Sequence, residues 1–256
     1  MGSISTLKNH LEEFWKNRHN AVLPSPDERK EYAKVIGDCF FPCAQKILGG
    51  YFRVFNRAGG NEISREIHPT SIELYYHEEG AGRFKDPIMY HTDDRKRSDE
   101  MKRKTNPRDY YESRGIESIP YYPFGSINPH VSGIDITFEN PKIHCRASFL
   151  IREYDVVYES GKRLSVKNST DIYDDMLIQG IPTENSGWIE WVDGEEIDEE
   201  MIGRVGRRNV PEFKKNEQGI WVRNTDVEGR DYFTIGGNRY AKCAFPWQFK
   251  VNLEKL

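Results

Sequence analysis

The sequence of 256 residues has few cysteines, no long apolar run and no excess of positive charge. Its four cysteines form neither a CxxC pair nor another spacing typical of a zinc site. It contains no run of about eighteen apolar residues and no opening signal-peptide pattern. We therefore expect a cytoplasmic monomer with reduced thiols that binds no metal or cofactor and spans no membrane.

The net charge of −4 excludes a general attraction to nucleic acid, so such a partner would require a local basic surface. One segment, residues 95–108, meets this requirement. It contains two acidic residues, Asp99 and Glu100, against the basic residues Arg95, Lys96, Arg97, Lys102, Arg103, Lys104 and Arg108. The pattern is typical either of a nucleic-acid contact or of a solvated charged loop.

Large aromatic side chains are abundant, with five Trp, fourteen Tyr and thirteen Phe, and they can build a substantial core. In the first fifty residues the apolar positions recur at helical spacing. The pattern predicts a helix over 7–20, a second helix that begins after Asp27 and runs through Ile36, and a third over 42–48 that ends at Gly49-Gly50. The chain therefore begins with helices.

Alternating bulky and polar residues then predict strands, which are the main elements after residue 50. We expect strands at 51–57, 63–76, 131–138 and 147–154, a short helix at 171–178, and late strands at 220–222 and 231–235. Residues 58–61 have turn composition between the first two strands. Helices followed by mostly antiparallel strands indicate a single α+β domain.

The second of these strands carries a carboxylate, Glu73, inside an otherwise apolar and aromatic stretch. A buried carboxylate is costly unless it has a function or a partner. Because side chains alternate along a strand, Glu73 and Tyr75 share one face, while Leu74 and Tyr76 share the other. Glu73 is therefore either a site residue or one member of a structural ion pair.

Six short motifs follow one another within residues 38–155. They are Ala44-Gln45-Lys46-Ile47-Leu48-Gly49, Ile72-Glu73-Leu74-Tyr75, Asp86-Pro87-Ile88-Met89-Tyr90-His91, Asn106-Pro107-Arg108, Ser132-Gly133-Ile134-Asp135 and Phe149-Leu150-Ile151-Arg152-Glu153. Their order resembles that of the alkyladenine (3-methyladenine) DNA glycosylases. The resemblance implies one domain over 1–256, with N-terminal helices packed on a curved, mostly antiparallel sheet and with 160–256 as an extension.

The resemblance also implies roles for individual residues. Glu73 would be the general base that activates water for attack on the sugar of a flipped, damaged or modified base. Arg152 would lie beside the catalytic water and balance the charge of Glu73. Tyr75 would stack on the base, and His91 would form the opposite wall. Further contacts to the base would come from Tyr76 and His130.

Contacts to DNA would come from the basic segment, in which Arg108 matches an arginine of the family. A serine, Ser132, stands where the family has a tyrosine that wedges into the duplex. Either the aromatic loop of Tyr121, Tyr122 and Phe124 or His130 substitutes for it, or the substrate is single-stranded DNA or a modified nucleoside. The alternative function is a non-catalytic module that binds nucleic acid or a nucleotide.

Overall fold

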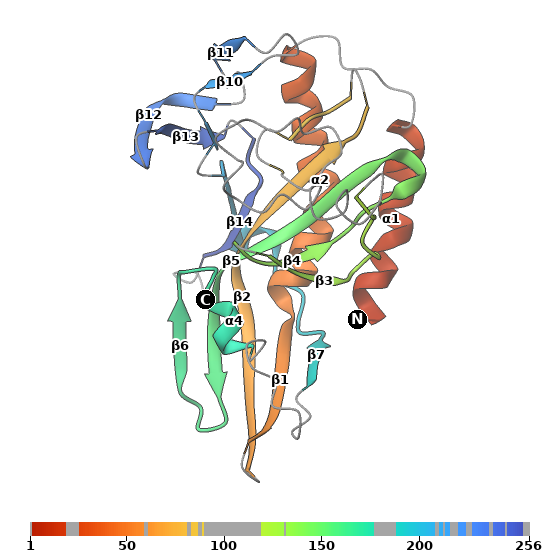
Figure 1. Cartoon of the computed structure of the whole chain (residues 1–256). Helices are drawn as coiled ribbons and strands as arrows, with labels where there is room; N and C mark the ends of the chain where they lie inside the picture. The colour runs from red at the N-terminus through yellow and green to blue at the C-terminus, as the bar shows by residue number, and fades with distance from the viewer. Residues whose placement is uncertain are drawn as a thin grey trace.

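The structure is a computed structural model. It describes residues 2–18, 26–58, 61–80, 83–86, 89, 119–130, 132–176, 188–207, 210–211, 213–215, 220–223, 227–235, 238–243 and 245–252. Helices cover one face of a curled antiparallel sheet, which confirms the expected α+β fold (Figure 1). No helix in the described ranges has the length and apolar character needed to span a membrane.

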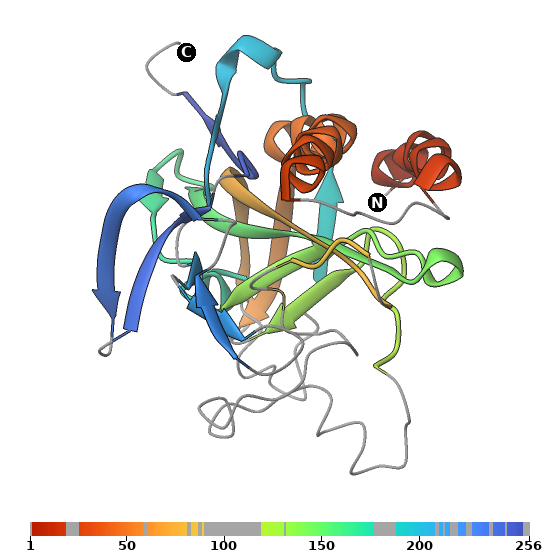
Figure 2. The same ribbon diagram turned by 90° about the horizontal axis from the view of Figure 1, so that it is seen from above.

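Two helices open the chain, α1 (Gly2–Arg18) and α2 (Pro26–Gly49), and they lie over the same side of the sheet (Figure 2). The prediction of a helical break before Pro42 was wrong, because α2 continues through this proline. A proline inside a helix costs about 3 kcal/mol, since it removes one hydrogen bond to the carbonyl four residues earlier. Here the helix buries Phe40, Ala44 and Ile47 on either side of Pro42, which offsets that cost.

In the described ranges nine strands form the main sheet, and every pairing among them is antiparallel. The order along the principal path is β3-β4-β5-β2-β1-β7, with β6 beside β5 and with β14 between β2 and β8. Their bounds are β1 Tyr51–Ala58, β2 Asn61–Glu78, β3 Ile127–His130, β4 Gly133–Thr137, β5 Cys145–Tyr158, β6 Arg163–Val166, β7 Trp188–Val192, β8 Ile202–Val205 and β14 Gln248–Val251.

Shorter elements complete the described chain. The strands β10 (Phe213–Lys215) and β11 (Trp221–Arg223) pair with each other. The strands β9 (Val210–Pro211), β12 (Val227–Ile235) and β13 (Asn238–Cys243) form a three-stranded sheet. Single turns of helix are η2 Pro141–Ile143, α4 Ile172–Asp175 and η3 Glu199–Met201.

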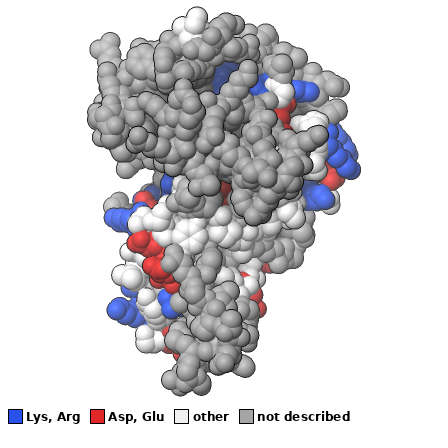
Figure 3. Space-filling model, in the orientation of Figure 1, with Lys and Arg blue, Asp and Glu red and all other residues white. Residues whose placement is uncertain are grey.

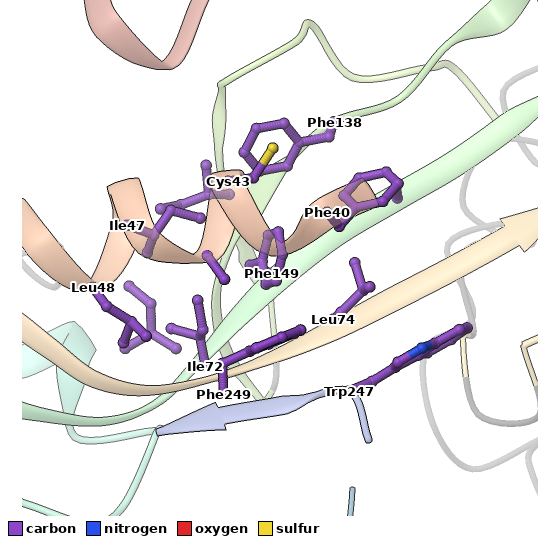
Figure 4. Close-up of a cluster of buried hydrophobic side chains, with 14 of the residues drawn as sticks. Phe40, Cys43, Ile47, Leu48, Ile72, Leu74, Phe138, Phe149, Trp247 and Phe249 are labelled. Atoms are coloured by element: carbon purple, nitrogen blue, oxygen red, sulfur yellow. The ribbon is translucent and has the colours of Figure 1, made fainter. Parts of the chain in front are cut away.

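The hydrophobic core lies between α2 and the sheet, as Figure 4 shows. Phe40 and Ile47 of the helix pack above Leu74 of β2, Phe149 of β5 and Phe249 of β14 (Figure 4). All five side chains are fully buried. Alternate residues of β2 point away from this core, and we call the opposite surface of the sheet, which carries Glu73, Tyr75 and His77, the site face.

Residues 160–256 contribute to the same sheet as the rest of the chain. The last strand, β14, pairs with residues 71–73 of β2 and with the whole of β8. Next to it, Trp247 is fully buried, and its indole nitrogen donates to the carbonyl oxygen of Ala33 in α2 at 2.9 Å. The C-terminal part therefore completes the layer that holds Glu73.

Candidate functional site

Glu73 lies near the middle of the site face with 3% of its surface exposed. One of its carboxylate oxygens, Oε2, receives Nε of Arg152 at 2.8 Å and the hydroxyl of Tyr75 at 2.9 Å. Arg152 also donates from Nη2 to the Tyr75 hydroxyl at 2.9 Å. Three of the residues predicted from the sequence thus form one closed hydrogen-bonded triangle, which we call the Glu73 triad.

Two β-bulges bring Arg152 to this position. Along β2 and β5, Pro69 pairs with Tyr154, but Ser71 pairs with Glu153 and Ile72 with Ile151. The register therefore skips Thr70 on β2 and Arg152 on β5, one extra residue on each strand. Bulges redirect side chains and are frequent beside functional sites. Here the bulge in β5 places Arg152 against Glu73.

The other carboxylate oxygen of Glu73, Oε1, accepts no hydrogen bond from the described residues. Burial, and next the nearby negative charge of Glu73, raise the pKa of the Tyr75 hydroxyl well above its ordinary value. Burial alone would lower the pKa of Arg152, but the neighbouring Tyr75 and Glu73 raise it overall. Both partners therefore keep their protons and remain donors to Oε2 at neutral pH.

A second buried ion pair, absent from the predicted site, lies beside Tyr75. The guanidinium of Arg207 is fully buried, and its central carbon is 4.6 Å from the centroid of the Tyr75 ring. Both terminal nitrogens contact Asp86, at 2.9 and 3.0 Å. Asp86 belongs to a motif noted in the sequence, but nothing local in the sequence indicates Arg207, which lies 121 residues further along the chain.

Neighbouring strands place further polar groups on the site face. Glu73 is opposite Gln248 of β14 on one side and opposite Leu150 of β5 on the other, and Leu150 in turn is opposite Asp135 of β4. Asp135 is buried and accepts a hydrogen bond from the hydroxyl of Ser148 at 3.2 Å. Sequence reasoning missed this second carboxylate because only the pairing of the strands brings it near Glu73.

Tyr76 was predicted to contact the substrate, but the structure does not bring it to the Glu73 triad. Its side chain points to the opposite face of β2, where it is fully buried in the core. There its hydroxyl donates to Glu78 at 2.8 Å, beside the Tyr32 hydroxyl, which donates to the same oxygen at 2.6 Å. Alternation along a strand gives Tyr76 a structural position in the core.

Tyr121 and Tyr122, predicted to contact nucleic acid, lie against a third buried cluster. The Tyr121 ring is 3.9 Å from the guanidinium carbon of Arg146, and its hydroxyl donates to Glu79. Arg146 contacts the same carboxylate at 2.7 Å and donates to the carbonyl oxygens of Ile119 and Pro120. These contacts fix the aromatic loop to the sheet and use both oxygens of Glu79, in contrast to Glu73.

Arg146 of β5 is opposite His77 of β2, and Glu73 lies four residues before His77 on β2. At about 3.3 Å per residue the two clusters are therefore roughly 13 Å apart along the sheet. Each contains a glutamate, an arginine and a tyrosine on the site face. The aromatic loop is consequently a neighbour of the Glu73 triad and not a part of it.

The remaining predicted residues lie outside the described residues. They are His91, Arg95, Arg97, Lys102, Arg103, Lys104 and Arg108, together with the side chain of His130. On the surface drawn in Figure 3, described acidic and basic side chains are interspersed. A role of the basic segment in binding DNA therefore stays a prediction.

Within the described residues, no group of three or more His, Cys, Asp and Glu side chains is placed to hold a metal ion. No protein-family model matches the sequence, and comparison with curated proteins and with solved structures finds no match. The function must therefore be argued from the chemistry of the site face.

Proposed function

We propose that this protein hydrolyses the N-glycosidic bond of a flipped, damaged or modified base in DNA, with Glu73 activating the attacking water. One observation carries the proposal. Both donors of the Glu73 triad bind the same carboxylate oxygen, and the second oxygen is left without a donor from the described residues. A carboxylate fixed in this way has one oxygen for positioning and one for taking a proton.

In the proposed reaction, Oε1 of Glu73 accepts a proton from water as the water oxygen bonds to the anomeric carbon of the sugar. The bond between that carbon and the base nitrogen breaks, and the base leaves with the bonding electrons. Arg152 holds the carboxylate in place and balances its charge. A base that already carries a positive charge needs little further acid catalysis, so a single carboxylate is sufficient.

The proposal is tested with methylated duplex and single-stranded DNA. Incubation with the protein followed by alkali should break the strands at abasic sites, and Glu73→Gln should abolish the breaks. Asp155→Asn is the matched control, because Asp155 is equally buried on β5 and contacts Arg163 at 2.7 Å, the same distance that separates Glu73 from Arg152. If Asp155→Asn and Glu73→Gln lose the same activity, the assignment of Glu73 as the base is wrong.

A non-catalytic binding module is the second candidate. The contacts of Glu73 favour this function too, because a short ion pair with Arg152 already balances the charge of Glu73. This function predicts that modified DNA or a modified nucleoside binds with equal affinity to wild type and to Glu73→Gln, and that no base is released. Binding that weakens steeply with salt would indicate phosphate contacts, and binding insensitive to salt would indicate a small ligand.

A further inference from the structure

A buried arginine from the C-terminal part of the chain holds the aromatic ring of the Glu73 triad. Arg207 follows β8 and contacts two rings, Tyr75 at 4.6 Å and Trp247 at 5.1 Å from its central carbon to each centroid. Its bidentate contact with Asp86 fixes the orientation of the guanidinium plane. The ring of Tyr75 therefore has a rigid cation against one face.

The same ion pair continues the hydrogen bonding of β2 where its neighbouring strand ends. The strand β14 pairs with β2 only at residues 71–73. Beyond that point the carbonyl oxygen of Leu74 accepts from Nη1 of Arg207 at 2.8 Å, and the amide of Tyr76 donates to Asp86 at 3.0 Å. Side chains thus take the place of a neighbouring strand at the Leu74 carbonyl and the Tyr76 amide, the two backbone groups that flank Tyr75.

We propose that Arg207 is a positioning residue, which holds Tyr75 so that its hydroxyl stays directed at Glu73 and Arg152. The inference rests on the proposed function, since the positioned group is the donor that fixes Oε2 of Glu73. The position of Arg207 also limits how a base can be recognised. With Arg207 over one face of the ring, a planar base stacks only on the opposite face of Tyr75.

The test measures the position of Tyr75 separately from activity. Protein labelled with 3-fluorotyrosine gives fluorine NMR signals, and the signal that Tyr75→Phe removes is that of Tyr75. Arg207→Lys keeps the charge but loses the planar contact with the ring. The double variant Asp86→Asn/Arg207→Gln removes both charges and leaves no unpaired buried charge. It can therefore be measured even if Arg207→Lys fails to fold.

Arg65→Lys is the control, because Arg65 lies on the same strand as Tyr75 and, like Arg207, packs over a tyrosine ring, at 5.9 Å, and contacts an aspartate, Asp175, at 3.6 Å. We expect both Arg207 variants to shift or split the Tyr75 signal and to lower kcat for base release by ~10-fold with little change in KM. Arg65→Lys should change neither quantity.

Two results would overturn the inference: a Tyr75 signal that is unchanged in the Arg207 variants, or an equal loss of kcat in Arg65→Lys. If wild type releases no base, the proposed function fails, but the Tyr75 signal still decides whether Arg207 positions the ring. The two failures are therefore distinguishable.

Discussion

Arg152 contacts one oxygen of Glu73 through two nitrogens, Nε at 2.8 Å and Nη2 at 2.7 Å. The carboxylate has almost no access to solvent, so this contact is what balances its charge. Removing one partner of a buried pair leaves an uncompensated charge in the protein, whereas removing both does not.

This asymmetry predicts how substitutions at Arg152 and Glu73 change the free energy of unfolding. Arg152→Met should lower the free energy of unfolding by ~3 kcal/mol, and the second substitution in Glu73→Gln/Arg152→Met should restore more than half of that loss. Urea unfolding of wild type, both single variants and the double variant measures the coupling. Additive single losses would show that the two charges do not depend on each other.

The buried tyrosines predict a loss of stability at high pH. Burial, and next a hydrogen bond to Asp175, raise the pKa of Tyr154 well above its ordinary value, so the folded protein retains a proton that the unfolded chain releases near pH 10. The contribution of Tyr154 to stability should therefore be constant below that pH and fall above it, by ~1.4 kcal/mol per pH unit. Urea unfolding between pH 8 and 11 should show a shallower fall in Tyr154→Phe than in wild type.

The three cysteines whose side chains the structure describes should differ in reactivity. Burial raises the pKa of all three thiols, but Cys43 and Cys145 are fully buried while Cys39 is half-buried. In a Cys243→Ser background, a thiol reagent at pH 8 should modify Cys39 first and the other two only when the protein opens. Mass spectrometry of the modified peptides gives the order, and rapid labelling of Cys43 would contradict the packing of α2 on the sheet.

The glycine between α2 and β1, Gly50, should not tolerate a side chain. A Cβ at Gly50 would lie 2.2 Å from a ring carbon of Trp191, so Gly50→Ala should cost ~2–3 kcal/mol through overpacking. Gly203→Ala is the control, because a Cβ at Gly203 would lie 3.7 Å from its nearest neighbour, the carbonyl oxygen of Lys250. Thermal unfolding should show a clear loss for the first variant and a change within about 0.5 kcal/mol for the second.

Local patterns predicted the strands β1, β2, β4, β5, β11 and β12 and part of the site, but they missed other strands, including β14, which pairs with Glu73. The alternation around Glu73 predicted the strand and the position of Glu73 and Tyr75 on the same face. The structure has β2 over Asn61–Glu78, where 63–76 was expected. Pro42 misled the prediction of α2, because the burial that stabilises the helix on both sides of a proline depends on the sheet beneath it.

Arg207 and Asp135 could not be found in this way. Arg207 reaches Tyr75 through contacts between segments that are distant in the sequence. Asp135 lies in the predicted strand 131–138, but only the pairing of β4 with β5 brings it near Glu73. The bulge that carries Arg152 to Glu73 is likewise a property of two strands together.

Contacts beside the Glu73 triad join residues made early in translation to residues made much later. The amide of Leu74 donates to the carbonyl oxygen of Trp247, and the Gln248 side chain donates to Ser71, 177 residues earlier in the chain. While the ribosome is still synthesising the C-terminal part, the edge of β2 that will meet Trp247 lacks this partner. The protein can therefore complete its site only after residues 247 and 248 have left the ribosome, and a nascent chain stalled before Arg207 would expose an open strand edge to its neighbours.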